Sequence, residues 1–132
     1  MTIQRQNPPA LHATSGYHHV TTVSGRTSAY LAGQCPLGLD GLVVAGDVLA
    51  QVDQVVANTA TALAAAGATA DDVVRTVIYV ATADRAVLSA VWNRFTGSAI
   101  GPAFSTASTL LGVTCLGYPG QLVELDVTAA VS

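Results

Sequence analysis

The sequence contains no lysine, and charged residues of any kind make up only 10% of its 132 positions. Its five cations are scattered arginines, and the formal net charge is −3. A protein that binds a phosphate backbone needs a clustered basic surface, so this composition disfavours nucleic acid as a partner. Glutamate is almost as scarce as lysine, because Glu124 is the only one in the chain.

Long apolar runs are also missing, although 51% of the residues are hydrophobic and the mean hydropathy is +0.49. Polar residues or glycines interrupt every run before the roughly 18 apolar residues of a membrane-spanning helix accumulate. The first nine residues lack the apolar stretch of a signal peptide, and two distant cysteines make no disulfide framework. We therefore expect a cytoplasmic protein without a membrane partner. Because so short a chain cannot bury all of its apolar surface internally, we also expect it to bury part of that surface against copies of itself.

Motifs for metals, phosphate cofactors and covalent catalysis are absent from the sequence. It has no Cys-x-x-Cys or His-x-His pair, no Walker or Gly-x-Gly-x-x-Gly loop, and no Gly-x-Ser-x-Gly elbow. Neither Cys35 nor Cys115 has a neighbouring cation that would activate its thiol, so both are expected to be buried and inert. We expect no metal and no cofactor.

The chain length predicts a single domain over residues 1–132, in which residues 1–14, with their paired prolines, form an extended arm. A glycine-centred hairpin turn is predicted at residues 24–26. Runs of β-branched and aromatic residues predict strands at residues 18–23, 27–32, 42–45, 73–80, 105–113 and 122–131.

One amphipathic helix is predicted to begin after Asp47, a good N-cap, and to end before Gly67. Its apolar residues recur at three- and four-residue spacing, so Gln51, Gln54 and Asn58 are predicted to face outward.

A second amphipathic helix is predicted between Asp84 and Gly97, and Trp92 on its apolar stripe is interpreted as a core aromatic. Strands and helices do not alternate strictly, which favours an α+β sheet with both helices on one face.

Glu124 and Asp126 lie on one face of the last predicted strand, because side chains alternate along a strand. A solvent-facing polar stripe would give the same pattern. The functional interpretation is a carboxylate that holds a water molecule or acts as a general base. The pattern leaves both readings open.

Four stretches occur in an order and at a spacing that resemble a known family. They are Gly16-Tyr17, Ala32-Gly33-Gln34 with Pro36, Ala65-Ala66-Gly67-Ala68 with Asp72-Val73-Val74, and Leu122-Val123-Glu124-Leu125-Asp126. Over about residues 15–130 the chain resembles the Rid family, the reactive intermediate deaminases also called YjgF or L-PSP proteins. The resemblance implies a chorismate-mutase-like α+β fold, with a mixed sheet and a homotrimer that has small-molecule sites in the clefts between subunits.

Family members of the deaminase type hydrolyse enamines and imines without a cofactor. The resemblance implies that Tyr17, the Gly33 backbone and Glu124 line the cleft, and that Glu124 holds the attacking water. These members also bind the substrate carboxylate with an arginine, whose position here falls at Ser108 or, in another alignment, at Phe104. Both residues are neutral.

Three functions are consistent with these residues. The first is hydrolysis of an enamine or imine that lacks a free α-carboxylate, with Glu124 and Tyr17 as catalytic residues and Gly33, Ser108 and Cys115 as substrate-binding residues. The second is a trimer that binds a small ligand and catalyses nothing. The third, an endoribonuclease, is disfavoured by the acidic charge.

Overall fold

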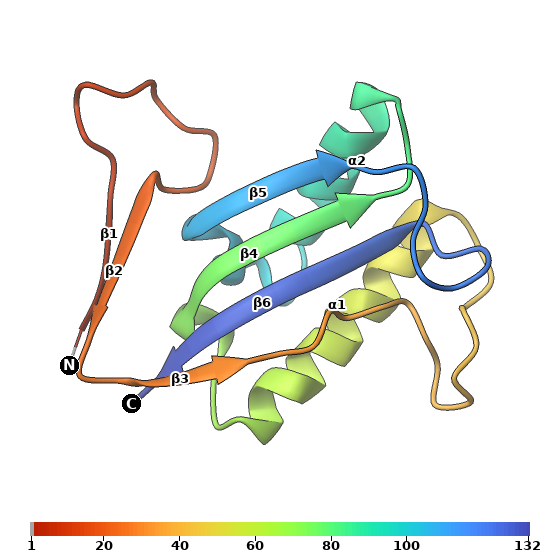
Figure 1. Cartoon of the computed structure of the whole chain (residues 1–132), viewed down its shortest axis with the longest axis horizontal. Helices are drawn as coiled ribbons and strands as arrows, with labels where there is room; N and C mark the ends of the chain where they lie inside the picture. The colour runs from red at the N-terminus through yellow and green to blue at the C-terminus, as the bar shows by residue number, and fades with distance from the viewer. Residues whose placement is uncertain (1) are drawn as a thin grey trace.

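The structure is a computed structural model that describes residues 2–132, in which two helices lie behind a mixed sheet (Figure 1). The four-stranded sheet has the order β3-β6-β4-β5, in which only β4 and β5 are parallel. The elements are β1 (Thr2–Gln6), β2 (Val20–Ser24), β3 (Thr27–Tyr30), α1 (Val48–Ala65), η1 (Ala70–Asp72), β4 (Val73–Val80), α2 (Arg85–Thr96), η2 (Gly101–Ser105), β5 (Ala107–Gly112) and β6 (Val123–Val131).

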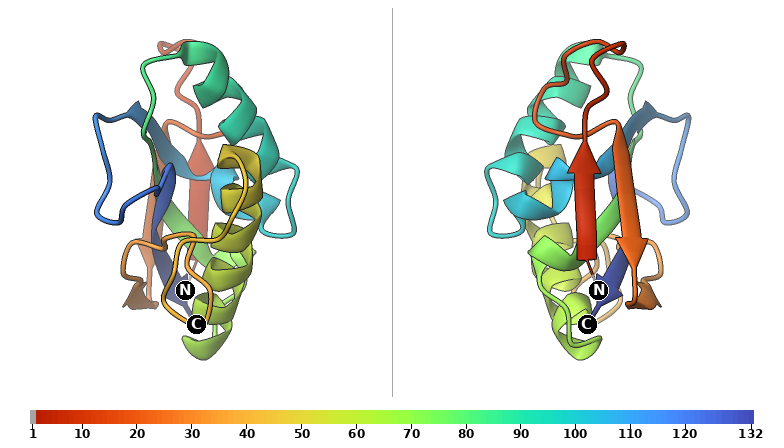
Figure 2. Two further views of the ribbon diagram at one scale, coloured as in Figure 1. Left: turned by 90° about the vertical axis from the view of Figure 1, so that its right-hand side faces the viewer. Right: turned by 90° about the vertical axis from the view of Figure 1, so that its left-hand side faces the viewer.

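The N-terminal segment differs from its prediction, because β1 pairs with β2 in a separate antiparallel ribbon. The predicted arm at residues 1–14 is therefore a strand followed by a loop, although Met1 lies outside the described residues. The predicted hairpin at residues 24–26 is also wrong: β3 leaves β2 there and pairs with β6 instead. Gly25, at a φ of +66°, allows this sharp change of direction. Figure 2 shows the ribbon standing beside the main sheet.

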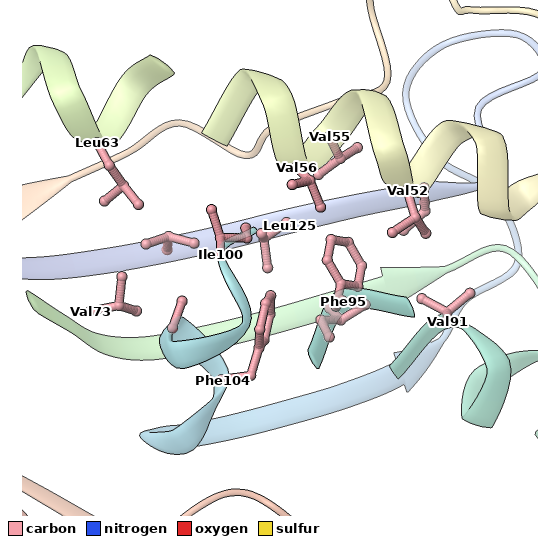
Figure 3. Close-up of a cluster of buried hydrophobic side chains, with 14 of the residues drawn as sticks. Val52, Val55, Val56, Leu63, Val73, Val91, Phe95, Ile100, Phe104 and Leu125 are labelled. Atoms are coloured by element: carbon pink, nitrogen blue, oxygen red, sulfur yellow. The ribbon is translucent and has the colours of Figure 1, made fainter. Parts of the chain in front are cut away.

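Both helices cover one face of the sheet, as the sequence predicts (Figure 2). Asp47 and Asp84 cap them, each side chain accepting a hydrogen bond from a backbone amide of the first turn. The core lies between the helices and the sheet (Figure 3), where the rings of Phe95 and Phe104 are 5.2 Å apart. No helix within residues 2–132 is long and apolar enough to cross a membrane.

Two amides of α1 that were predicted to face outward are turned toward the protein. Gln51 is only 2% exposed; its Nε2 donates to the carbonyl of Gly120 at 2.9 Å, and its Oε1 accepts from the amide of Leu122 at 2.8 Å. Asn58 is half-buried and donates to two carbonyls of the loop that follows β3. The prediction failed because it counted polar residues as surface, whereas these side chains satisfy backbone groups of irregular loops.

The loop between β3 and α1 contains no strand at residues 42–45, contrary to the prediction. Only an isolated bridge joins Leu37 to Val43 there. The segment folds back on its own loop instead of joining the sheet: the amide of Val44 donates to the carbonyl of Pro36 at 2.9 Å.

The face of the main sheet away from the helices is called the open face below. It carries Tyr30, which is 80% exposed, Leu111, which is 42% exposed, and the half-buried Tyr79. Glu124 and Asp126 of β6 lie on the same face. Apolar and aromatic groups therefore remain uncovered beside the carboxylates.

Candidate functional site

Glu124 lies near the start of β6, directly opposite Tyr79 of β4. Its neighbours Val123 and Leu125 are fully buried against the helices, whereas Glu124 and Asp126 are half-buried on the open face. The predicted alternation along this strand is therefore confirmed.

One oxygen of the Glu124 carboxylate is bound by two side chains from different loops. Gln121 Nε2 donates to Oε1 at 3.1 Å, and the Cys35 thiol donates to the same oxygen at 3.3 Å. Burial, together with the hydrogen bond to Glu124 and its negative charge, raises the pKa of Cys35 to about 11. The thiol is consequently protonated at neutral pH, as expected of an inert cysteine.

The other oxygen of Glu124 lies against Gly33. A Cβ atom at position 33 would stand 2.3 Å from Oε2, which is closer than real Cβ atoms come to any neighbour. Two backbone hydrogen bonds between Gln34 and Leu125, of 2.7 and 3.0 Å, hold this loop against β6. Only glycine at position 33 lets the Glu124 carboxylate lie this close to the backbone.

Tyr17 and Ser108 meet in a different place, a hollow of about 250 Å³ lined by Ser15, Tyr17, Trp92, Ser108 and Leu110. None of these five side chains is charged. Trp92 is half-buried, and its ring meets Tyr17 edge-on at 6.1 Å and Phe104 at 5.9 Å. Trp92 therefore packs against the core, as predicted, and also forms one wall of the hollow.

The strand register separates this hollow from Glu124. Ser108 pairs with Thr76 of β4 and is hydrogen-bonded to its fully buried hydroxyl at 2.6 Å, so Ser108 faces the helices. Glu124 pairs with Tyr79, three residues farther along β4 and on the other face. The predicted site residues thus form two groups on opposite faces of one chain: Tyr17 with Ser108, and Gly33 with Glu124.

Phe104 and Cys115 lie in neither group. Phe104 is completely buried between α2 and the sheet. Cys115 is exposed on the loop between β5 and β6, where it lines a second hollow with Gln121, so its predicted burial is wrong. The segment connects two strands, and such connecting loops run over the protein surface.

One ion pair lies at the surface, away from both groups. Arg94 binds both carboxylate oxygens of Asp53, at 2.8 and 2.7 Å, and this hydrogen bonding lowers the pKa of the Asp53 carboxyl. Both side chains are about half exposed, so the pair contributes little to stability. Within residues 2–132, no three His, Cys, Asp or Glu side chains lie together as a metal site would need.

Sequence reasoning did not identify Cys35 and Gln121 as neighbours of Glu124. Gln121 is 4% exposed and, besides Glu124, binds the backbone of Tyr118 and Val123. Its position three residues before the only glutamate was an available signal, as was the position of Cys35 directly after Gly33-Gln34.

The family model described as endoribonuclease L-PSP matches residues 7–131, which is almost the whole chain. A crystal structure of YyfB from Yersinia pestis, a Rid-family protein of unknown function, is 34% identical, with a TM-score of 0.85 over 99% of this chain and 100% of that one. The chain belongs to the Rid family.

Two further solved Rid relatives support the same architecture. YyfA from Yersinia pestis is 30% identical, with a TM-score of 0.62 over 90% of each chain. A YjgF/YER057c/UK114 family member from Mycobacterium tuberculosis is 26% identical, with a TM-score of 0.65 over 98% of this chain and 100% of that one. Among curated proteins no match is found. The α+β Rid fold predicted from the sequence, with a mixed sheet and two helices, is therefore confirmed.

Proposed function

We propose that this Rid protein hydrolyses an enamine or imine that lacks a free α-carboxylate, without a cofactor, in clefts between its subunits. The observation that carries the proposal is the Glu124 carboxylate, which is held through Oε1 while Oε2 lies beside Gly33. A fixed carboxylate with one oxygen free of side-chain donors can accept a proton from water.

The separation of the two groups supports a site shared between copies. Tyr17 and Ser108 face the helix side of the sheet, whereas Gly33 and Glu124 belong to the open face. A heterologous contact brings two different faces of neighbouring copies together, and in a trimer this contact closes into a ring with three equivalent clefts. The uncovered aromatic and apolar side chains of the open face supply the surface that such a contact would bury.

The absence of charge in the hollow at Tyr17 sets the substrate class. We place the family's arginine position at Ser108, which lines this hollow, because Phe104 is buried in the core. A buried carboxylate without a cationic partner loses a few kcal/mol of binding, on the order of a hundredfold or more. Substrates with a free α-carboxylate should therefore bind poorly.

In the proposed reaction, Oε2 of Glu124 accepts a proton from water as the water oxygen bonds to the imine carbon. The carbon–nitrogen bond then breaks, and both protons of the water end on the nitrogen, which gives a carbonyl compound and ammonia. The Tyr17 hydroxyl would act from the facing copy, where it can donate a hydrogen bond to the imine nitrogen. Water supplies every atom that is added.

The test is a coupled assay in which an amine or amino-acid oxidase generates imines, with and without a carboxylate, in the presence of the protein. We expect accelerated hydrolysis only of the carboxylate-free imines. Glu124→Gln should abolish the acceleration, and Asp126→Asn, a neutralised carboxylate on the same strand face, should keep it. Equal rates for wild type and Glu124→Gln would refute the proposal.

Ser108→Arg tests the substrate class separately, because it returns a guanidinium to the hollow. We expect this variant to gain affinity for pyruvate that the wild type lacks, measured by fluorescence of Trp92, the only tryptophan. Carboxylate binding of equal strength in both proteins would contradict the assignment. If ligands bind but no imine is hydrolysed, the chain is a binding module instead.

A further inference from the structure

The two donors that hold Glu124 are themselves fixed by one helix. Gln51 of α1 binds the carbonyl of Gly120 and the amide of Leu122, on both sides of Gln121. Asn58, two helical turns farther on, donates to the carbonyl of Cys35 at 3.1 Å. Residues seven apart lie on one side of a helix, so α1 holds both donors in place at once.

Among the residues that the structure describes, this arrangement restrains one carboxylate oxygen and leaves the other without a side-chain donor. Gln121 and Cys35 both donate to Oε1, from loops that are 86 residues apart in sequence, while Oε2 lies beside Gly33 and accepts from no side chain of residues 2–132. Two donors from different directions fix the plane of a carboxylate better than one can. The hydrogen bonds to Oε1 therefore determine the position of Oε2, the oxygen that would react.

We infer that Cys35 is a positioning residue for Glu124: with Gln121, its thiol holds Oε1 and leaves Oε2 as the oxygen that accepts the proton from the attacking water. The inference rests on the proposed function and assigns a second residue to it. Cys35 takes no part in bond formation and stays a hydrogen-bond donor throughout. The raised pKa of the Cys35 thiol agrees with this donor role, because a thiolate has no proton to donate in a hydrogen bond.

The contact is tested first without substrate, by alkylation of Cys35 with iodoacetamide in a Cys115→Ser background that leaves one thiol. Glu124→Gln removes the negative charge, which is one of the causes that suppress the thiolate, and replaces the carboxylate with an amide whose neutral oxygen accepts a weaker hydrogen bond. We expect alkylation to accelerate at least about threefold at pH 8, because only the thiolate reacts. Asp126→Asn should leave the rate unchanged. Equal rates in wild type and Glu124→Gln would overturn the contact.

The positioning role is tested by steady-state hydrolysis. We expect Cys35→Ala to lower kcat about tenfold with little change in KM, because substrate binding does not depend on the orientation of Oε1. Cys35→Ser keeps a donor and should recover most of kcat, and Asp126→Asn should match the wild type. An unchanged kcat in Cys35→Ala, or no recovery with serine, would overturn the inference.

The two experiments separate this inference from the proposed function. If the wild type hydrolyses no imine, the proposed function fails, and the catalytic part of the inference falls with it. Faster alkylation in Glu124→Gln would then still uphold the contact between thiol and carboxylate. If hydrolysis depends on Glu124 but not on Cys35, only the positioning role is refuted.

Discussion

Replacing Gly33 with alanine should displace the Glu124 carboxylate while leaving the fold in place. The new Cβ would stand 2.3 Å from Oε2, and ordinary contact begins near 3.4 Å, so the carboxylate must move by about 1 Å. The obstacle is the end of a flexible side chain, and the φ angle of Gly33 is not in the left-handed region. The backbone can therefore accept alanine.

Moving the carboxylate by this distance breaks its hydrogen bonds to Cys35 and Gln121. We expect Gly33→Ala to cost about 1–2 kcal/mol of unfolding free energy and to lower kcat on the order of a hundredfold. Urea denaturation and the coupled hydrolysis assay measure the two effects.

The matched control is Gly117→Ala, where an added Cβ meets no atom within 4 Å. A double variant, Gly33→Ala with Glu124→Asp, shortens the carboxylate side chain and should relieve the clash, which restores stability without restoring full activity. Wild-type activity in Gly33→Ala would refute the close approach as a requirement of the site.

Two further predictions concern stability. Gln51→Leu leaves the carbonyl of Gly120 and the amide of Leu122 without their partner, so we expect a loss of about 2–4 kcal/mol in urea denaturation. Gln4→Leu, at an exposed position of β1, should change the stability little. The pKa of Cys35 is higher in the folded protein, about 11, than the ordinary thiol value of 9. The protonated thiol therefore contributes fully to the free energy of unfolding below pH 9, and this contribution is lost as the pH rises toward about 11. Urea midpoints should fall over that interval in the wild type and less in Cys35→Ala; parallel falls would contradict the pKa assignment.

Local patterns predicted the helices and the central strand well, because caps and periodicity act over a few residues. Asp47 and Asp84 begin the helices as expected, and Val73–Val80 forms β4 at the predicted bounds. The pairing of β3 with β6 could not be read locally, since its partners are about 100 residues apart. The sequence TIQRQ of β1 was missed because it has no apolar alternation to mark a strand.

The site was only partly predictable for a related reason. Family resemblance marked Tyr17, Gly33 and Glu124, and strand alternation correctly placed Glu124 away from the core. Neither could tell that Ser108 faces the helices, because this depends on its pairing with Thr76. Cys35 reaches Glu124 only through tertiary structure.

The proposed function requires that two copies of the chain build each working site. Mixing unfolded Glu124→Gln and Tyr17→Ala variants in equal amounts and refolding them together tests it most directly. Neither variant alone should hydrolyse the imine, whereas random assembly gives about a quarter of the clefts both native residues, and the mixture should recover about a quarter of wild-type activity. A mixture that stays inactive, while refolded wild type recovers, would contradict the shared site.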